Sequence, residues 1–237
     1  MKYYEGHEKA YRKLKASGHV CWDKTAFDGF YMRPFLEAAL THMQFKHDHP
    51  RALELGCGTG PLSCLLAQKG FDVRGIDISA SAVELAREEA AKRGLAIRYD
   101  VGDVCALPEG ERFDLIVDAH CLHCIVWDED RARVLSSVKR LLNDDGYFLI
   151  ETMAHRAGLS FGDAFRYDER GIVWAKAPEN RFADCVCIDG QWYVPSRRLL
   201  LPEQLKSELV HAGFRTELCT IHDQGEKDPP EFQAICR

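Results

Sequence analysis

The sequence predicts an α/β fold, a mostly parallel sheet with helices on both faces, and three observations point to it. Short apolar runs alternate strictly with amphipathic helical stretches between residues 52 and 150. The first apolar run ends in a glycine-rich loop, as a buried parallel strand does before its helix. No repeat, linker or charge block divides the 237 residues, a length sufficient for one α/β domain with a buried core.

The N-terminal segment, residues 1–45, predicts two or three helices, with apolar residues at helical spacing over 35–43. The core strands are then expected, in chain order, at residues 52–55, 71–77, 96–99, 113–118 and 147–150. Pro61 suits the first position of the helix that follows the glycine loop. Ser79 or Ser81 is expected to cap the next helix, and Ser81 with Glu84 fits a capping box. A further amphipathic helix is expected over 134–142.

Residues 153–200 interrupt the alternation and are interpreted as an insertion rather than a domain. They are rich in aromatic residues and contain two short strand patterns, 172–176 and 185–194. A last helix is expected over 201–212, because Gly213 follows it. Residues 216–222 and 231–236 predict a closing antiparallel pair.

Charge and cysteine content bound the function. The net charge of −6 argues against a nucleic-acid backbone as the main partner, since such a partner usually requires a basic face. No run of about 18 apolar residues is present, so no membrane partner is expected. Residues 1–6 lack the apolar core of a signal peptide, and the ten cysteines are therefore expected as free thiols in the cytoplasm.

The glycine loop, residues 54–60 (ELGCGTG), is the strongest signal for a ligand site. Its glycines allow a tight turn and a close approach of the backbone to a ligand. The spacing is G-x-G-x-G, and Pro61 stands where a dinucleotide fingerprint would have its third glycine. The proline removes an N–H that a pyrophosphate would use. The loop therefore favours a nucleoside ligand without phosphates.

Two acidic residues follow at the ends of the next strands. Asp77 lies about 20 residues beyond the loop, where a carboxylate can accept both ribose hydroxyls. Asp103, after the third strand, is placed to accept from an adenine amine.

Taken in order, these residues resemble the cofactor site of class I S-adenosylmethionine (SAM)-dependent methyltransferases, in particular the small-molecule group. Glu54 to Gly60 resembles motif I, Asp77 the ribose-binding acid and Asp103 the adenine-side acid, while 113–118 resembles the strand that leads to the acceptor site. The resemblance covers residues 50–150 well and the C-terminal pair loosely. It implies a Rossmann-like, seven-stranded sheet whose last strand is antiparallel.

The resemblance also implies the organisation of the chain and of its cofactor site. It divides the chain into an N-terminal helical lid (1–45), a SAM-binding core (50–152), an acceptor-site insertion (153–200) and a C-terminal helix and strand pair (201–237). The residues expected to contact SAM are Glu54, Gly56, Cys57, Gly58, Gly60, Asp77, Ile78, Asp103, Val104 and Asp118. Of the aromatic residues near the N-terminus, five are candidates for the lid: Tyr4, Tyr11, Trp22, Phe27 and Tyr31.

Histidines and cysteines cluster directly after the fourth strand, in residues 118–124 (DAHCLHC). Strand ends at this edge of such a sheet face the ligand, so the segment is expected beside the donor methyl group. Three interpretations remain open. His120, His123 and Cys124 could hold a divalent metal, since they fall near the metal-ligand positions of methyltransferases similar to the ubiquinone-biosynthesis enzymes. His120 or His123 could act as a general base, or the side chains could simply line the wall.

The sequence thus predicts methyl transfer from SAM to a small-molecule acceptor by in-line displacement. The acidic chain and its lid-like segments favour a small acceptor over a macromolecule. Two alternatives stay open: a non-catalytic SAM-binding or metal-responsive protein, and an NAD-linked oxidoreductase, which Pro61 disfavours. Neither the acceptor atom nor the oligomeric state follows from the sequence.

Overall fold

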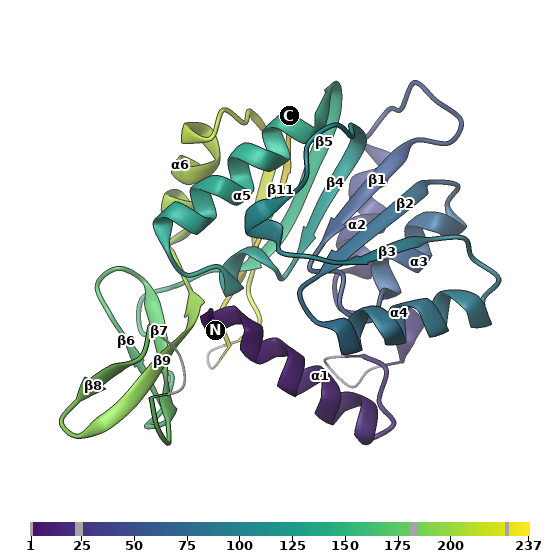
Figure 1. Ribbon diagram of the computed structural model, residues 1–237. Coiled ribbons are helices and arrows are strands. Elements are labelled where there is room, and N and C mark those ends of the chain that lie inside the picture. Colours follow the sequence, from purple (N-terminus) through teal and green to yellow (C-terminus); the bar gives the residue numbers. More distant parts are fainter. Residues whose placement is uncertain (1, 22–25, 181–183, 226–227) are drawn as a thin grey trace.

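A computed structural model of the chain describes residues 2–21, 26–180, 184–225 and 228–237 (Figure 1). Its main sheet has seven strands in the order β10-β11-β5-β4-β1-β2-β3. The strands are β1 (Arg51–Leu55), β2 (Asp72–Asp77), β3 (Arg98–Val101), β4 (Phe113–Ala119), β5 (Leu142–Met153), β10 (Thr216–His222) and β11 (Glu231–Cys236). β1 to β5 pair in parallel, whereas β11 is antiparallel to both of its neighbours. The expected Rossmann-like sheet with an antiparallel last strand is confirmed.

Helices cover both faces of this sheet, also as expected. The helices over the faces are α2 (Arg33–Thr41), α3 (Pro61–Gln68), α4 (Ala80–Lys92), α5 (Asp128–Leu141) and α6 (Pro202–His211), and α1 (His7–Ala16) lies at the edge of the sheet. The described residues also include the short 3₁₀ turns η1 (Tyr3–Gly6), η2 (Phe27–Gly29), η3 (Val104–Ala106) and η4 (Leu122–Cys124). Within the described ranges, no helix has the length and apolarity that crossing a bilayer requires.

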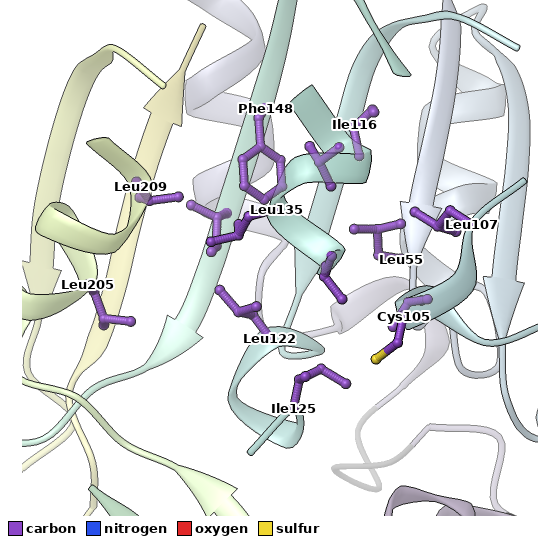
Figure 2. Packing of buried hydrophobic residues seen from close by; sticks show 14 of the residues in the cluster. Leu55, Cys105, Leu107, Ile116, Leu122, Ile125, Leu135, Phe148, Leu205 and Leu209 are labelled. Atoms are coloured by element: carbon purple, nitrogen blue, oxygen red, sulfur yellow. The ribbon is translucent and has the colours of Figure 1, made fainter. Parts of the chain in front are cut away.

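Alternate residues of the buried strands contribute to cores on opposite faces of the sheet. On one face, Leu55, Ile116 and Phe148 pack with residues of α5 and α6, including Leu135, Leu205 and Leu209 (Figure 2). On the other, residues of β1, β4 and β5 pack with Leu36 of α2 and Leu62, Leu65 and Leu66 of α3. Successive residues of a strand point to opposite faces of the sheet, and both faces are covered here. Most residues of these strands are therefore buried, which explains their continuous apolar sequences.

The insertion forms a second, antiparallel sheet rather than two isolated strands. Its order is β6-β7-β9-β8, made of β6 (Phe165–Tyr167), β7 (Ile172–Ala177), β8 (Val186–Ile188) and β9 (Gln191–Arg198). The single strand expected over 185–194 was wrong. Asp189 and Gly190 both have positive φ, 53° and 77°, so this Asp-Gly pair turns the segment into a hairpin.

The bounds of two strands also differ from expectation. β5 extends from Leu142 to Met153, because it pairs with β4 on one side and with β11 on the other. The third strand starts at Arg98 rather than at residue 96. Ser79, one of the two expected caps, caps α4 by accepting from the Ala82 N–H at 3.1 Å. The capping box of Ser81 with Glu84 was wrong, because Ser81 lies inside the helix and not at its N-cap.

Candidate active site

A cavity of about 470 Å³ lies at the edge of the sheet where the parallel strands end. The loops after β1, β2, β3 and β4 line it, together with α1, residues 30–32 and the start of β11. α1 crosses below this edge, between α4 and the second sheet (Figure 1). The helix therefore occupies the place expected for a lid.

The backbone conformation and the close packing of the loop after β1 both favour glycine at its three glycine positions. Their φ angles are all positive, at 62°, 53° and 82° for Gly56, Gly58 and Gly60. A Cβ atom on Gly56 would lie 2.8 Å from the Cys121 sulfur, and one on Gly58 would lie 2.7 Å from the Tyr11 hydroxyl. One on Gly60 would approach Tyr99 even more closely. Side chains from three other elements thus enclose the loop.

Asp77, at the end of β2, holds this loop in place. Its Oδ2 accepts from the Gly58 N–H at 2.9 Å, and its Oδ1 accepts from the Ser79 N–H at 2.8 Å. Burial raises the pKa of the carboxyl, and the two backbone donors oppose that shift. Each carboxylate oxygen can accept twice. Capacity for two hydroxyl donors therefore remains on a residue that lines the cavity.

Asp103, after β3, is already hydrogen-bonded on both oxygens. Its Oδ2 accepts from the Tyr4 hydroxyl at 2.7 Å and from Lys2 Nζ at 2.8 Å, while its Oδ1 accepts from the Cys105 N–H. Burial would raise the pKa of Asp103, but these donors outweigh it and lower the pKa. A ligand amine at this position would share Oδ1 with the Cys105 N–H, because Oδ2 already accepts from both Tyr4 and Lys2.

Glu54 lies on β1, two residues before Gly56. It is buried and accepts a hydrogen bond from the Ser63 hydroxyl of α3. Burial raises its pKa to about 8. Glu54 is therefore a neutral or weakly ionised group that ties the glycine loop to the first helix after it.

The His/Cys segment after β4 is fixed from three sides. Asp118 Oδ1 accepts from the backbone N–H groups of Cys121 and Leu122. Buried Arg131 of α5 donates to the carbonyl oxygens of Leu122 and Ile125, and it forms a bidentate ion pair with Glu208 of α6. Leu122 and Ile125 also pack into the main core (Figure 2). The segment is consequently a well-supported platform.

His120 is the residue of this platform that combines strain, charge and access to the cavity. Its φ is +65°, a left-handed conformation that is uncommon for a residue other than glycine. Its Nε2 lies 3.2 Å from Glu151 Oε1 and 3.8 Å from Glu231 Oε2. Burial would lower the pKa of His120, but Glu151, Glu231 and Asp118 outweigh it and raise the pKa.

His123 has a different environment. It is buried, and its Nδ1 lies 3.3 Å from the Thr152 hydroxyl and accepts from the Met153 N–H at 3.4 Å. Burial lowers its pKa to about 4. Burial would raise the pKa of the neighbouring Cys124 thiol, but Arg197 and His123 outweigh it and lower that pKa to about 7.

Most of the residues expected at the cofactor site line this one cavity. They are Glu54, Gly56, Cys57, Gly58, Asp77, Ile78, Asp103 and Val104, joined at its far end by His120, His123 and Cys124. Gly60 and Asp118 lie behind the lining, where Gly60 packs against Tyr99 and Asp118 holds the His/Cys platform. Of the aromatic lid candidates, Tyr4, Tyr11 and Tyr31 line the cavity, Phe27 does not, and Trp22 falls outside the described residues.

The metal hypothesis gains no support from this geometry. Among the residues that the structure describes, no three His, Cys, Asp or Glu side chains are grouped as a metal ion requires. The rings of His120 and His123 are 5.4 Å apart, and Cys124 Sγ donates to the His120 carbonyl oxygen at 3.6 Å. The set His120, His123 and Cys124 stays an untested prediction as a metal site.

Sequence reasoning missed the residues that surround His120. Glu151 and Glu231 are buried carboxylates, and Tyr31 packs its ring edge-on against His120 at 5.9 Å. These residues come from β5, β11 and the segment before α2, far apart in the sequence. The sequence did contain a signal for both glutamates. Glu151 lies inside an otherwise apolar strand and Glu231 at the start of one, and a charged residue in such a place often has a function, because buried polar groups are uncommon.

Comparison with known proteins finds a family match over part of the chain. Residues 52–146 match a family described as a methyltransferase domain. The ubiquinone biosynthesis O-methyltransferase of Haemophilus ducreyi is 33% identical over 109 residues, 44% of this chain and 45% of that protein. The Brucella anthropi protein of the same name is 27% identical over 169 residues, 71% of this chain and 61% of that protein. The chain spans about half the length of these curated relatives.

Solved structures show the same fold. A SAM-dependent methyltransferase from Clostridium acetobutylicum superposes with a TM-score of 0.65 at 19% identity, covering 96% of this chain and 98% of that one. The Burkholderia thailandensis 1,6-didemethyltoxoflavin-N1-methyltransferase, with 1,6-didemethyltoxoflavin and S-adenosylhomocysteine bound, gives 0.64 at 19% identity, covering 97% and 86%. Residues 52–146 therefore resemble a methyltransferase domain, and the chain has the fold of these solved SAM-dependent methyltransferases. The predicted resemblance and fold are confirmed.

Proposed function

We propose that this protein transfers a methyl group from SAM to a small-molecule acceptor, with His120 as the general base. The observation that carries the proposal is the order of residues along one cavity. The glycine loop and Asp77 lie at the ends of β1 and β2, while His120 lies at the end of β4, next to β5. A donor bound over β1 to β3 would therefore present its methyl group toward His120.

The residues at the β1–β3 end fit an adenosyl ligand. The loop at Gly56 and Gly58 offers bare backbone, and Asp77 keeps acceptor capacity for two hydroxyls. Bound there, SAM supplies an activated methyl carbon whose bond to sulfur breaks, with the electron pair going to sulfur, as the acceptor lone pair forms the new bond. The residues of the chain hold the reactants in line, which provides much of the acceleration in such a displacement.

The structure favours His120 over His123 as the base. The Nδ1 of His123 is engaged by Thr152 and by the Met153 N–H, and its pKa is lowered to about 4 by burial, which makes it a weak proton acceptor. His120 has a raised pKa and is oriented by Glu151, in the arrangement of a base held by a carboxylate. The proton released by the acceptor would pass to the His120 imidazole.

Substitution of His120 by Asn tests the role, because Asn tolerates the left-handed backbone while removing the base. With labelled SAM and the small-molecule fraction of a cell extract, we expect single-turnover transfer to fall about 100-fold. Binding of S-adenosylhomocysteine should stay within about twofold. His42→Asn, an exposed histidine outside the cavity, is the matched control and should transfer at the wild-type rate. An unchanged rate in H120N would rule out the base.

The same assay separates the other function classes. Label on protein or nucleic acid would overturn the small-molecule acceptor. Stabilisation of the protein by NAD, and not by SAM or S-adenosylhomocysteine, would favour an oxidoreductase. Tight SAM binding without transfer to any fraction would favour a binding protein. The proposal locates the enzyme in the cytoplasm, which agrees with ten free cysteines.

A further inference from the structure

We infer that Glu231 recognises the acceptor and that the acceptor carries a basic amine, an inference that rests on the function proposed above. Glu231 is the first residue of β11, the strand that pairs with β5. Because β11 is antiparallel to β5, it begins at the edge where the parallel strands end. Glu231 therefore lines the cavity beside His120, at the opposite end of the sheet from β2 and β3.

The Glu231 side chain is buried, and one of its two carboxylate oxygens lacks a hydrogen bond in the described structure. Its side chain is only 5% exposed, and its Oε2 has no hydrogen-bond partner among the described residues. His120 Nε2 lies 3.8 Å from that oxygen, and the same nitrogen is closer to Glu151, at 3.2 Å. Burying a charge that lacks a partner is costly, so such groups mark a place where a ligand supplies the partner.

Charges around Glu231 leave a net negative end of the cavity. Glu151 already has a partner on each oxygen, because its Oε1 faces His120 and its Oε2 accepts from Gln233 at 2.5 Å. Asp228 adds a further carboxylate to the lining. His120 thus shares this end of the cavity with three acidic groups. Arg197 also lines the cavity, but the groups whose pKa values it shifts are His7, His123 and Cys124, not Glu231.

The remaining wall at this end is apolar and aromatic. Phe30, Tyr31, Met32 and Met153 line it, and the Tyr31 ring lies against His120. A buried carboxylate beside an aromatic ring is a favourable environment for an ammonium group. A carboxylate-bearing acceptor would be repelled by Glu231 and Glu151, and a neutral acceptor would leave Glu231 without a counter-charge. The geometry consequently selects an amine.

The test divides the small-molecule fraction of a cell extract by ion exchange near pH 7 into cationic, neutral and anionic pools. Each pool is incubated with the protein and labelled SAM. We expect label in the cationic pool, and we expect Glu231→Gln to lower that transfer at least about tenfold by raising the KM for the acceptor. Binding of S-adenosylhomocysteine by the variant should stay within about twofold of the wild type.

Glu203→Gln is the matched control, because Glu203 is an exposed glutamate of α6 outside the cavity. Its transfer should equal that of the wild type. Label confined to the neutral or anionic pool, or full transfer to amines by E231Q, would overturn the amine inference and leave the methyltransferase proposal intact. Absence of label from every pool, with no binding of S-adenosylhomocysteine, would instead overturn the proposed function and the inference with it.

Discussion

The two ends of the cavity differ in how their polar groups are paired. We call the end at the glycine loop and Asp77 the donor end, and the end at His120 and Glu231 the acceptor end. At the donor end, each Asp77 oxygen accepts a backbone N–H, and each loop glycine is closely packed by another side chain. At the acceptor end, His120 has a strained backbone and Glu231 Oε2 has no hydrogen-bond partner among the described residues. The difference teaches that the glycine loop and Asp77 are already held by the protein itself, whereas in the proposed function Glu231 takes its missing partner from the acceptor.

The largest effect should come from breaking the packing of the donor end. In Gly56→Ala, the new methyl group would lie 2.8 Å from the sulfur and 2.9 Å from the Cβ of Cys121, at a φ of +62°. Cys121 cannot move easily, because Asp118 holds its N–H. The loop must therefore shift, and we expect the affinity for SAM, measured by calorimetry, to fall about 100-fold.

Gly94→Ala separates backbone strain from packing. Gly94 has nearly the same φ, +66°, but a Cβ atom there would meet nothing within 4 Å. Both variants should lose about 1 kcal/mol of unfolding free energy from the left-handed backbone. Only Gly56→Ala should lose SAM binding. Equal affinity in the two variants would mean that close packing of the glycine loop does not shape the donor site.

The same contrast explains what the sequence could predict. The donor end lies within residues 54–104, where a short motif, its following proline and two strand-end acids stand in fixed order. Local turns and strand order are enough to bring these residues together. The parallel strands follow from the same periodicity, whereas the number of strands and the antiparallel direction of the last one came from the family resemblance.

The acceptor end could be predicted only in part, because its contacts are long-range. His120 was visible from its place after the fourth strand, but its partners Glu151 and Glu231 lie 31 and 111 residues further along the chain. Their meeting depends on the register of β11 against β5, which pairs Gln233 with Glu151 and Glu231 with Met153. No local pattern specifies that register. The Asp-Gly turn at 189–190, in contrast, was a local signal that was overlooked.

An intermediate effect should appear when the unpaired charge of the acceptor end is removed. Burial raises the pKa of Glu231 from 4.5 to about 7, with His120 opposing and Glu151 adding to the shift. The folded protein thus binds this proton more tightly than the unfolded chain, so stability is lost as the pH rises from about 4.5 to about 7. Glu231→Gln should abolish that loss.

The measurement is urea unfolding of the protein without SAM at several pH values. We expect E231Q to exceed the wild type by about 2 kcal/mol near pH 8 and to differ little near pH 5. Glu203→Gln should show no such divergence, because its carboxylate is exposed. If the unfolding free energies of E231Q and wild type change with pH in the same way, Glu231 has a partner in solution. The acceptor end would then be paired like the donor end.

The smallest effect concerns the helix that closes the cavity. Glu8 of α1 accepts from the Ser79 hydroxyl at 2.6 Å, and from the hydroxyl and N–H of Ser81 at 2.7 Å and 3.1 Å. These bonds join the lid to the first turn of α4, directly after Asp77. Glu8→Gln keeps the shape but weakens the bonds, by about 1 kcal/mol in total.

We therefore expect S-adenosylhomocysteine to dissociate about fivefold faster from E8Q in a stopped-flow displacement experiment, with little change in the association rate. Glu5→Gln is the control in the same segment, since its carboxylate forms no such bond to α4 in the described structure. If both variants release the ligand at the wild-type rate, α1 does not retain the cofactor. The donor end would then be held by the glycine loop and Asp77 alone, independently of the helix that covers it.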